Sequence, residues 1–541
     1  MNEGGKRKAG GRLEVAVIYP GPRNQGLASL AVHSLYRQIS NQPSVNCERI
    51  FIEGGQSRPV SIESGRPAAA FDFLAVTASF EEQWVLLPYL LSRSGIPPRW
   101  RQRHAAHPIV AVGGFAVRLN PGPVLPFADL VVPSEAETVL PSILETLSQG
   151  HGQQRQELYQ ALGAIEGVAV HPDSTARIPA CLFTGTTPVA QVGVSDDSVF
   201  SNMFLVETGR GCPVGCRFCA VGYSRRPPVF FGVDEIVAAA EEGINCGLRI
   251  GLVGASLARH PDLVELVERF AREGADLSPA SLDANVLSSS SGETLLRQLS
   301  RSGQRTITLA VESGSQRIRR MINKPLTLDM LECAVTRLGQ AGILNLKLYL
   351  MYGMPTETDQ DLEQTVELVT RVQKWLLSAQ KQYGRAGRLT ISANPFVPKP
   401  HTPLGREAMP TVSKLKKMRN FLERNISKIG GVAFSGFSPR LAVLQCLLDR
   451  SGEEVAQLLE LAQGEWPPPG ALIKEQVPNL NEIVHADWPM DRPSSWDMID
   501  VGFSPATEKS EHEKALLGET TPICSPDRCD QCGACQAGTI Q

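Results

Sequence analysis

Short runs of aliphatic and β-branched residues alternate with longer helical patterns along most of this chain, and no other feature limits the fold as strongly. Strands that alternate with helices at this spacing pair in parallel through crossover helices. We therefore expect an α/β protein that begins with a Rossmann-like, doubly wound domain over residues 13–150. No G-x-G-x-x-G follows the first strand, so a dinucleotide site is not expected there. The strands of this domain are predicted at residues 13–21, 48–54, 72–79, 108–114 and 129–134.

A second alternating series covers residues 203–412 and looks unlike the first. Its six strand–helix units predict a partial (β/α)6 barrel, whose chemistry would lie at the carboxyl ends of the strands. The strands of the barrel are predicted at residues 204–209, 248–254, 277–285, 306–314, 344–353 and 389–397.

Four further segments complete the predicted domain organisation. Residues 1–12 form a flexible tail, and residues 151–202, with weak periodicity and several prolines, connect the two domains. Residues 413–503 are helical and then irregular, and residues 504–541 form a cysteine-rich, metal-binding tail. A chain of 541 residues has room for these units, because one hydrophobic core stops growing at about 250–300 residues.

The composition excludes several classes of protein. Hydrophobic residues make up 42% of the chain, charged residues 20%, and the net charge is -3, which is typical of a soluble globular protein. Bulk electrostatic binding to nucleic acid is therefore not expected. The sequence has neither a signal peptide nor an 18-residue apolar run, so we expect a cytoplasmic protein without a membrane span. In that reducing compartment, clustered cysteines indicate metal ligands or redox groups rather than disulfides.

Three of the twelve cysteines, Cys212, Cys216 and Cys219, fall within eight residues, directly after the first predicted barrel strand. At this cysteine frequency, a C-x3-C-x2-C spacing would arise by chance on the order of 0.006 times in the chain. Three thiolates on one loop can hold three corners of a four-iron cluster, which leaves one iron open for an outside ligand. The alternative is a structural zinc ion completed by a distant His or Cys. The position after a barrel strand favours a catalytic loop.

The segment CPVGCRFC, with Phe218 before its last cysteine, resembles the signature of radical S-adenosylmethionine (radical SAM) enzymes. This resemblance implies a 4Fe-4S cluster on the cysteine loop, with S-adenosyl-L-methionine bound to the open iron. One-electron reduction would then cleave the sulfonium to a 5'-deoxyadenosyl radical. Further blocks resemble the subgroup that carries an N-terminal cobalamin-binding-like domain; they lie at residues 252–263, 309–327, 346–362 and 395–403.

The resemblance also implies cofactor-binding residues on the barrel strands. Glu312, after the fourth strand, is expected to contact S-adenosylmethionine, and Ser256 and Lys347 are candidates for the same pocket. Each has a structural alternative, because Glu312 could be a solvated helix-entry residue, Lys347 could pair with a barrel carboxylate and Ser256 could cap a helix. Where relatives often show a basic residue in a PSLR block, this chain has Asp283 and Asn285, so the contact on the third strand is expected to differ.

Two interpretations of the N-terminal domain stay open. Its parallel sheet and its glycines Gly113 and Gly114 resemble cobalamin-binding domains, and glycines at that edge would let a flat corrin ring approach the backbone. The D-x-H-x-x-G segment that supplies a cobalt ligand in many such domains is missing, and His33 lies in a helical pattern as a packing residue. The domain therefore either holds cobalamin without a histidine ligand or is vestigial and binds partners or substrate.

The tail contains a second set of cysteines with the spacing C-x4-C-x2-C-x2-C: Cys524, Cys529, Cys532 and Cys535. Four thiolates this close can complete the coordination of one metal centre, either a second iron-sulfur cluster or a tetrahedral zinc ion. A cluster would accept or pass an electron, whereas zinc would only fasten the tail. The tail also resembles the C-terminal segment of the same radical SAM subgroup, which extends the resemblance over nearly the whole chain.

These features together predict a radical SAM iron-sulfur enzyme, and a methyltransferase acting on an unactivated carbon if cobalamin binds. Without cobalamin, a rearrangement, an oxidation or a sulfur insertion is expected. A non-catalytic iron-sulfur scaffold would use the same folds without cleaving S-adenosylmethionine. An RNA-modifying methylthiotransferase would need cluster cysteines in the N-terminal domain, which contains only Cys47. The expected partners are an electron donor such as flavodoxin or ferredoxin, and a substrate that fold and cofactor do not specify.

Overall fold

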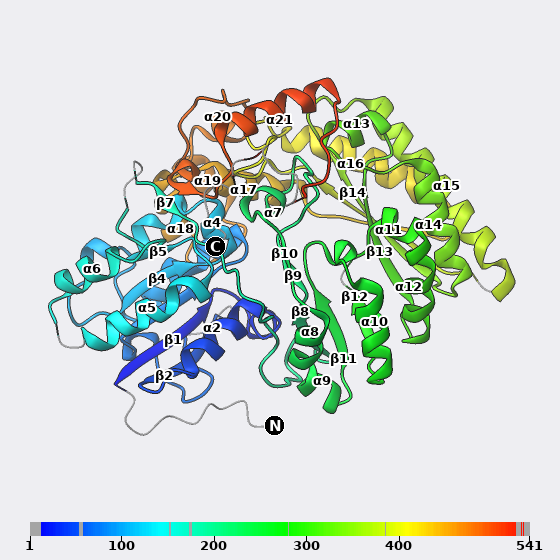
Figure 1. The fold of residues 1–541 in the computed structure, drawn as a ribbon. Helices are drawn as coiled ribbons and strands as arrows, with labels where there is room; N and C mark the ends of the chain where they lie inside the picture. The colour runs from blue at the N-terminus through cyan, green and yellow to red at the C-terminus, as the bar shows by residue number, and fades with distance from the viewer. Residues whose placement is uncertain are drawn as a thin grey trace.

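The computed structural model describes residues 12–52, 58–150, 153–172, 176–279, 281–384, 386–525, 532 and 534. The N-terminal domain lies on one side of the molecule and the barrel on the other, and C-terminal helices lie above both in Figure 1. Among the helices of the described segments, none is both long and apolar enough to span a membrane.

The N-terminal domain is a doubly wound sheet, as the sequence predicts. Its elements are β1 Leu13–Tyr19, α1 Arg23–Gly26, α2 Leu30–Ser40, β2 Val45–Phe51, β3 Phe73–Thr77, α3 Leu86–Arg93, β4 Ile109–Gly113, α4 Phe115–Leu119, β5 Leu130–Val132, α5 Ala136–Gln149, α6 Arg155–Gly163 and β6 Ala169–Val170. The strand order is β2–β1–β3–β4–β5–β6, parallel except for β6. Because side chains alternate along a strand, Val15 and Val17 pack against α2 and α5, whereas Ala16 and Ile18 join the core that includes α3.

The N-terminal sheet continues beyond residue 150, into the segment expected to be a connector. Helix α6 packs Leu162 into the core of the sheet, and β6 pairs with the edge strand β5. The two residues of β6 are too few to give a periodic signal in the sequence, which explains why only the structure reveals this strand.

The barrel is open and consists of two parallel sheets, with the order β12–β11–β8 and β13–β14–β15–β16. A parallel bridge between Leu282 and Leu309 joins them, and the described strands do not close into a barrel. All six predicted strands are present, and β16 adds a seventh from the segment expected to be helical and irregular. The strands are β8 Met203–Glu207, β11 Arg249–Val253, β12 Leu277–Pro279, β13 Thr306–Glu312, β14 Asn345–Tyr352, β15 Leu389–Pro395 and β16 Val432–Ser435.

The helices of the barrel cover the outer face of these sheets (Figure 1). In β14, buried Leu346, Leu348 and Leu350 alternate with less buried residues, so one face of the strand packs on the helices. The third strand is shorter than predicted, because Asp283 accepts a hydrogen bond from the N–H of Asn285 and starts a helix there. The helices are α8 Val233–Ala239, α9 Glu241–Asn245, α10 Leu263–Arg272, α11 Ala284–Ser288, α12 Ser290–Arg301, α13 Gln316–Met321, α14 Leu328–Gln340 and α15 Asp359–Gln380.

The C-terminal region ties the two domains together. The side-chain amide of Asn120, in the N-terminal domain, donates to the carbonyls of Asp449 and Ser451, at 3.0 and 2.7 Å. Strand β17 Ile499–Asp500 pairs with β7 Ile178–Pro179. The helices of this region are α16 Val412–Ile426, α17 Pro439–Arg450, α18 Ala456–Leu461, α19 Gly470–Gln476, α20 Leu480–Val484 and α21 Pro505–Leu517.

Candidate functional site

The cysteine loop lies at the carboxyl edge of the barrel, beside the end of β8. A short antiparallel ladder of β9 Gly209–Arg210 and β10 Val229–Phe230 precedes and follows the loop, which leads into helix α7 Val221–Ser224. Gly211 has φ +76°, and a Cβ there would lie 2.4 Å from the carbonyl oxygen of Arg225, so this turn requires glycine. The fold therefore places the three cysteines where barrel enzymes carry their chemistry.

The three thiols lie in a common, mostly buried environment. Cys216 is buried, and Cys212 and Cys219 are partly buried. Burial raises the pKa of all three thiols, that of Cys216 to about 12, and the three groups influence one another electrostatically. The metal-free protein therefore holds them protonated, and metal binding would release protons. Three neighbouring sulfur donors fit three corners of an iron-sulfur cluster.

A single metal ion would require the three sulfur atoms to lie closer together than a four-iron cluster does. With zinc–sulfur bonds of about 2.3 Å, tetrahedral coordination requires sulfur atoms roughly 4 Å apart. Within the described part of the chain, no group of three or more Cys, His, Asp or Glu side chains is placed so that it could hold a metal ion. A four-iron cluster separates its ligands more widely, because each thiolate binds a different iron.

Glu312 is the last residue of β13 and has an unusual backbone conformation. Its φ is +68°, and the register of β13 shifts between Ala310 and Glu312. A bulge and a left-handed non-glycine residue both re-aim a side chain and recur at functional sites. Because Glu312 is only 8% exposed, it is not a solvated helix-entry residue.

Lys324 is the ion-pair partner of Glu312, and its charge also acts on the thiols of the cysteine loop. Its Nζ is 3.6 Å from Oε1 of Glu312. Burial raises the pKa of Glu312, and the ammonium of Lys324 opposes this rise. Burial lowers the pKa of Lys324, but nearby anionic groups, with Glu312 the strongest, more than reverse the effect, so that the lysine stays charged. This pair gives the site a partly buried cation and a buried anion near the thiols.

Ser256 also lies at the cysteine loop. Its hydroxyl donates to the carbonyl of Gly211 at 3.2 Å, next to Cys212. Ser256 precedes a short 3-10 helix, Leu257–Arg259, but its side chain makes no capping hydrogen bond to it. Its contact is therefore with the loop rather than with the helix.

Lys347 lies deeper in the barrel than the other predicted residues. It is in register with Thr308, and its Nζ lies over the ring of Tyr349, 5.0 Å from the centroid. Glu312 is in register with Leu350, three residues further along β14. At 3.3 Å per residue, Lys347 is about 10 Å from the carboxyl edge where Glu312 lies. A role for Lys347 in the S-adenosylmethionine pocket stays a prediction.

A cavity of about 420 Å³ lies between the carboxyl edge of the N-terminal sheet and the barrel. One wall comes from Thr77, Gly113 and Val132, at the ends of β3, β4 and β5, together with α2 and α5. The opposite wall includes residues 209–211, directly before Cys212. In doubly wound sheets, ligands bind beyond the carboxyl ends of the strands, which is where this cavity lies.

Gly113 and Gly114 both line the cavity, but Gly114 has a structural reason to be glycine. Its φ is +101°, and a Cβ would lie 2.3 Å from the carbonyl oxygen of Ala78. A Cβ on Gly113 would lie 3.1 Å from the carbonyl oxygen of Val132. At both positions the atoms that exclude a larger side chain belong to the protein's own backbone, so these glycines do not by themselves indicate a corrin ring.

His33 is a packing residue, as the sequence analysis predicts. One ring nitrogen contacts the carbonyl of Leu27 at 2.9 Å, and the other accepts from the N–H of Val192 at 3.2 Å. Burial lowers its pKa to about 4. Neither nitrogen is therefore available to a metal, and the described residues that line the cavity include no histidine.

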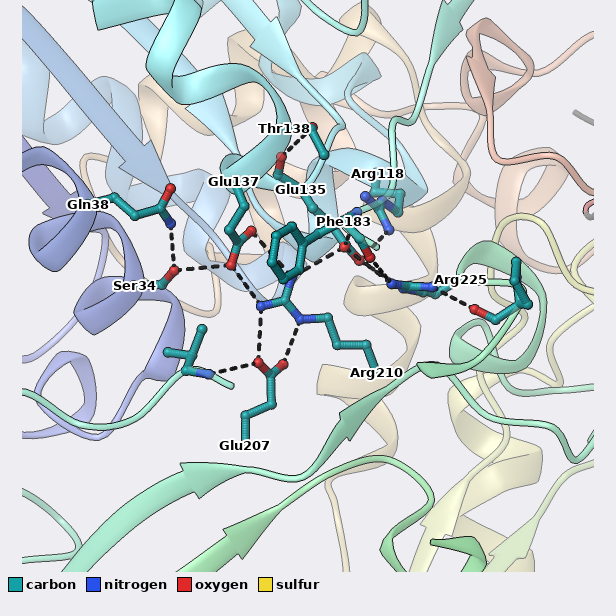
Figure 2. Close-up of polar contacts among 12 residues, drawn as sticks. Ser34, Gln38, Arg118, Glu135, Glu137, Thr138, Phe183, Glu207, Arg210 and Arg225 are labelled. Carbon is teal, nitrogen blue, oxygen red and sulfur yellow. Dashed lines mark hydrogen bonds and ion pairs between the residues drawn. The ribbon is translucent and has the colours of Figure 1, made fainter. Parts of the chain in front are cut away.

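Figure 2 shows a network of charges that crosses from the N-terminal domain to the barrel at the cavity. Arg210, two residues before Cys212, bonds to both oxygens of Glu207, at 2.8 and 3.0 Å. The same guanidinium reaches Glu137 at 2.7 Å and Glu135 at 3.2 Å, at the start of α5. The carboxylates of Glu207 and Glu137 outweigh the effect of burial and raise the pKa of Arg210. Glu135 also pairs with Arg118 and Arg225.

Two of the four tail cysteines lie within the described residues. The N–H of Cys524 donates to the carbonyl of Pro213 at 2.9 Å, and Cys532 is buried. Cys529 and Cys535 lie outside the described residues. The start of the tail thus lies against the cysteine loop, and the metal at the tail stays a prediction.

Sequence reasoning missed three charged residues of this site: Arg210, Arg217 and Lys324. Arg217, between Cys216 and Phe218, is fully buried. Lys324 follows α13, which begins shortly after Glu312 and returns the chain to the end of β13. The sequence shows only a lysine between a short helical segment and a proline. That this lysine pairs with Glu312 becomes visible only when the chain folds back to the end of β13.

Known proteins resemble both halves of the chain. A family model described as radical SAM proteins, N-terminal, matches residues 31–171, and the model of the radical SAM superfamily matches residues 206–369. An uncharacterized protein of Methanocaldococcus jannaschii is 28% identical over 470 residues, which cover 86% of this chain and 94% of that protein. A tRNA-2-methylthio-N(6)-dimethylallyladenosine synthase of Methylococcus capsulatus is 26% identical over 294 residues, 51% of this chain and 58% of that protein.

Among solved structures, the chain is similar to TsrM from Kitasatospora setae, a radical S-adenosylmethionine methyltransferase with tryptophan substrate and a SAM analog bound. The TM-score is 0.52 with 12% sequence identity, and the match covers 74% of this chain and 76% of that chain. A likeness at this identity shows a shared fold, including the N-terminal domain in front of the barrel. The cysteine loop, Glu312 and Lys324 all lie within the superfamily match, and the chain belongs to the radical SAM superfamily, whose members use a 4Fe-4S cluster and S-adenosylmethionine.

Proposed function

We propose that this radical SAM enzyme is a cobalamin-dependent methyltransferase that acts on an unactivated carbon. The observation that carries the proposal is the cavity, which joins the carboxyl edge of the N-terminal sheet to the residues directly before Cys212. A cofactor bound at that edge would meet a substrate held next to the cluster. The fold relative TsrM is a methyltransferase, which supports the proposal at the level of fold analogy.

Each part of the site has a role in this proposal. Cys212, Cys216 and Cys219 hold the cluster, and S-adenosylmethionine binds beside Glu312 and Ser256. When bound, the cluster and S-adenosylmethionine supply one-electron radical chemistry, and cobalamin supplies a methyl group. Lys324 offsets the negative charge that thiolates and the buried Glu312 bring to one place. The apolar side chains of α2 and α5 that line the cavity exclude water from it.

The residues of the cavity fit a cobalamin held without a histidine ligand. The walls combine apolar side chains with neutral polar groups, such as Ser34, Thr77 and Ser134, and with the charged network around Arg210 on the side toward the cysteine loop. No histidine is among its described lining residues, in agreement with the missing D-x-H-x-x-G segment. Cobalamin would therefore lie on the sheet edge without a protein imidazole on its cobalt.

The test uses full-length protein purified and reconstituted without oxygen. Iron, sulfide and cobalt contents are measured with added cobalamin, and dithionite-driven formation of 5'-deoxyadenosine is compared with that of a Cys216→Ala variant. Ala136→Trp narrows the cavity, and Ser142→Trp, on the exposed side of the same helix, is the matched control. We expect Ala136→Trp to weaken cobalamin binding at least tenfold and Ser142→Trp to change it less than twofold.

The outcomes distinguish the cleavage of S-adenosylmethionine from the binding of cobalamin. Cleavage that depends on Cys216 without any bound cobalamin would leave radical chemistry in place and favour rearrangement, oxidation or sulfur insertion. Equal cobalamin binding by both tryptophan variants would move the cobalamin site away from the cavity. Iron binding without cleavage would favour a non-catalytic scaffold.

A further inference from the structure

The chain that follows α21 is built into the cysteine loop. The N–H of Cys524 donates to the carbonyl of Pro213. The side-chain amide of Asn323 donates to the carbonyls of Gly215 and Thr521, at 3.0 and 3.2 Å, and its oxygen accepts from the N–H of Thr521 at 2.9 Å. One asparagine thus holds the loop and the C-terminal segment together, although they are about 300 residues apart in the sequence.

Arg217 connects the cysteine loop to more segments of the chain than Asn323 does. It lies between two cluster cysteines in the sequence, and its side chain is fully buried. Its Nε is 3.1 Å from Glu511 on α21, and Nη1 donates to the carbonyls of Met321 and Glu519, at 3.0 and 2.8 Å. Nη2 donates to the hydroxyl of Thr521 at 3.2 Å, and that hydroxyl lies 2.8 Å from Glu511. The guanidinium therefore joins the cysteine loop, the end of α13 and the C-terminal segment.

This geometry depends on the shape of the side chain as well as on its charge. A buried guanidinium presents several N–H groups in a fixed plane, whereas an ammonium is a single point of charge. Lysine at this position could keep the ion pair with Glu511 but not the bonds to carbonyls on two other segments. Those carbonyls would then be left buried without a donor, which is costly.

We propose that Arg217 is a positioning residue that fixes the cysteine loop to the C-terminal segment, so that this segment forms one wall of the cluster site. The inference rests on the proposed role of the loop as the cluster site. Asn323 directly precedes Lys324, which pairs with Glu312. A shift of the C-terminal segment would therefore disturb both the loop and the charged pair beside the thiols.

A second contact brings the tail to the same place. The ring of Phe503 lies 4.7 Å from that of Tyr223, whose hydroxyl donates to the carbonyl of Gly215. The next residue, Ser504, donates its N–H to the carbonyl of Cys532 at 3.4 Å. Cys524 thus contacts the cysteine loop directly, and Cys532 contacts the residue that follows Phe503.

The first experiment uses metal-free, full-length protein, because the contacts are present without a cluster. Hydrogen exchange is compared for Arg217→Lys, Glu511→Gln and Thr521→Val. The matched control is Glu508→Gln, on the same helix, whose carboxylate pairs with Arg406 instead. We expect amides in residues 213–219 and 519–524 to exchange at least tenfold faster in the three variants, and less than twofold faster in the control. Glu511→Gln and Thr521→Val keep the proposal testable if Arg217→Lys does not fold.

The second experiment measures the reconstituted proteins by iron content and by electron paramagnetic resonance of the reduced cluster. We expect Arg217→Lys to retain less than half of the wild-type iron, and Glu511→Gln to shift the spectrum while the control keeps it. Unchanged exchange together with an unchanged cluster spectrum would overturn the positioning role and leave the proposed function intact. Faster exchange in the variants of a protein that binds no cluster would contradict the proposed function and keep the connection between loop and tail.

Discussion

Replacing Arg210 by methionine should lower the free energy of unfolding by about 3–5 kcal/mol, because it breaks the ion pairs that join the two domains. The variant Arg210→Met leaves Glu207 with one hydrogen bond, from the N–H of Val189 at 3.3 Å. Glu137 keeps only a 3.4 Å contact with Ser34 among the bonds drawn in Figure 2. The side chains of Arg210, Glu137 and Glu207 are 13 to 17% exposed, so these charges are poorly screened by water. Removing one partner of such a pair typically costs this amount, because the other charge stays buried and uncompensated.

The loss should become smaller in acid. Burial already raises the pKa of Glu207, and the loss of Arg210 would raise it further. A carboxyl whose pKa is higher in the folded than in the unfolded protein binds its proton more readily when folded, so the variant gains stability as the pH falls from 8 toward 5. A second change, Glu207→Met, removes the stranded charge and should recover at least 1 kcal/mol.

The assay is urea unfolding at pH 8 and pH 5, followed by tryptophan fluorescence and compared within the same transition. Arg297→Met is the control, because the pair of Arg297 and Glu293 is 58 and 64% exposed and should contribute less than about 0.5 kcal/mol. A loss below 1 kcal/mol for Arg210→Met would refute the argument. So would a double variant with Glu207→Met that is no more stable than the single one.

Three further predictions concern separate parts of the chain. His33 has a pKa of about 4, so between pH 6.5 and pH 4 only the unfolded protein takes up a proton at this residue, and the free energy of unfolding should fall by up to about 3 kcal/mol over that range. Urea titrations at both pH values should show no such fall for His33→Asn. Gly114→Ala should lower the melting temperature by several degrees, because a Cβ would collide with the carbonyl of Ala78; an unchanged melting temperature would contradict this. Cys529→Ala and Cys535→Ala should each remove the tail metal, measured as zinc or as iron above that of the cysteine loop, while the loop keeps its own iron.

The fold was largely predictable because its strands carry strong local patterns. All eleven predicted strands of the two domains are present, because a run of apolar residues between helical patterns is a local signal that does not depend on tertiary contacts. To the sheets of the two domains the structure adds β6 and β16, which have two and four residues and too little sequence for a pattern. The third barrel strand was predicted too long, although Asp283 is a local signal for the start of the helix that it caps.

The candidate site was predictable only in part. The cysteine spacing is local, so it placed Cys212, Cys216 and Cys219 on one loop. The contacts of Arg217 and Lys324 depend on residues far away in the sequence, and no spacing reveals them. For Lys347, the block of sequence indicates a strand but not how deep in the barrel the residue lies.

The cysteine loop is held by different parts of the molecule before its first cysteine and between its last two. Before Cys212, Arg210 connects the chain to carboxylates at the start of α5 in the N-terminal domain. Within the loop, Arg217 connects it to α21 and the C-terminal segment. A loop with three prospective metal ligands would have to be ordered at considerable entropic cost if it stood alone. Because buried ion pairs fix it from both sides, its thiols are arranged before any metal binds, and each domain that contacts the loop can influence the chemistry there.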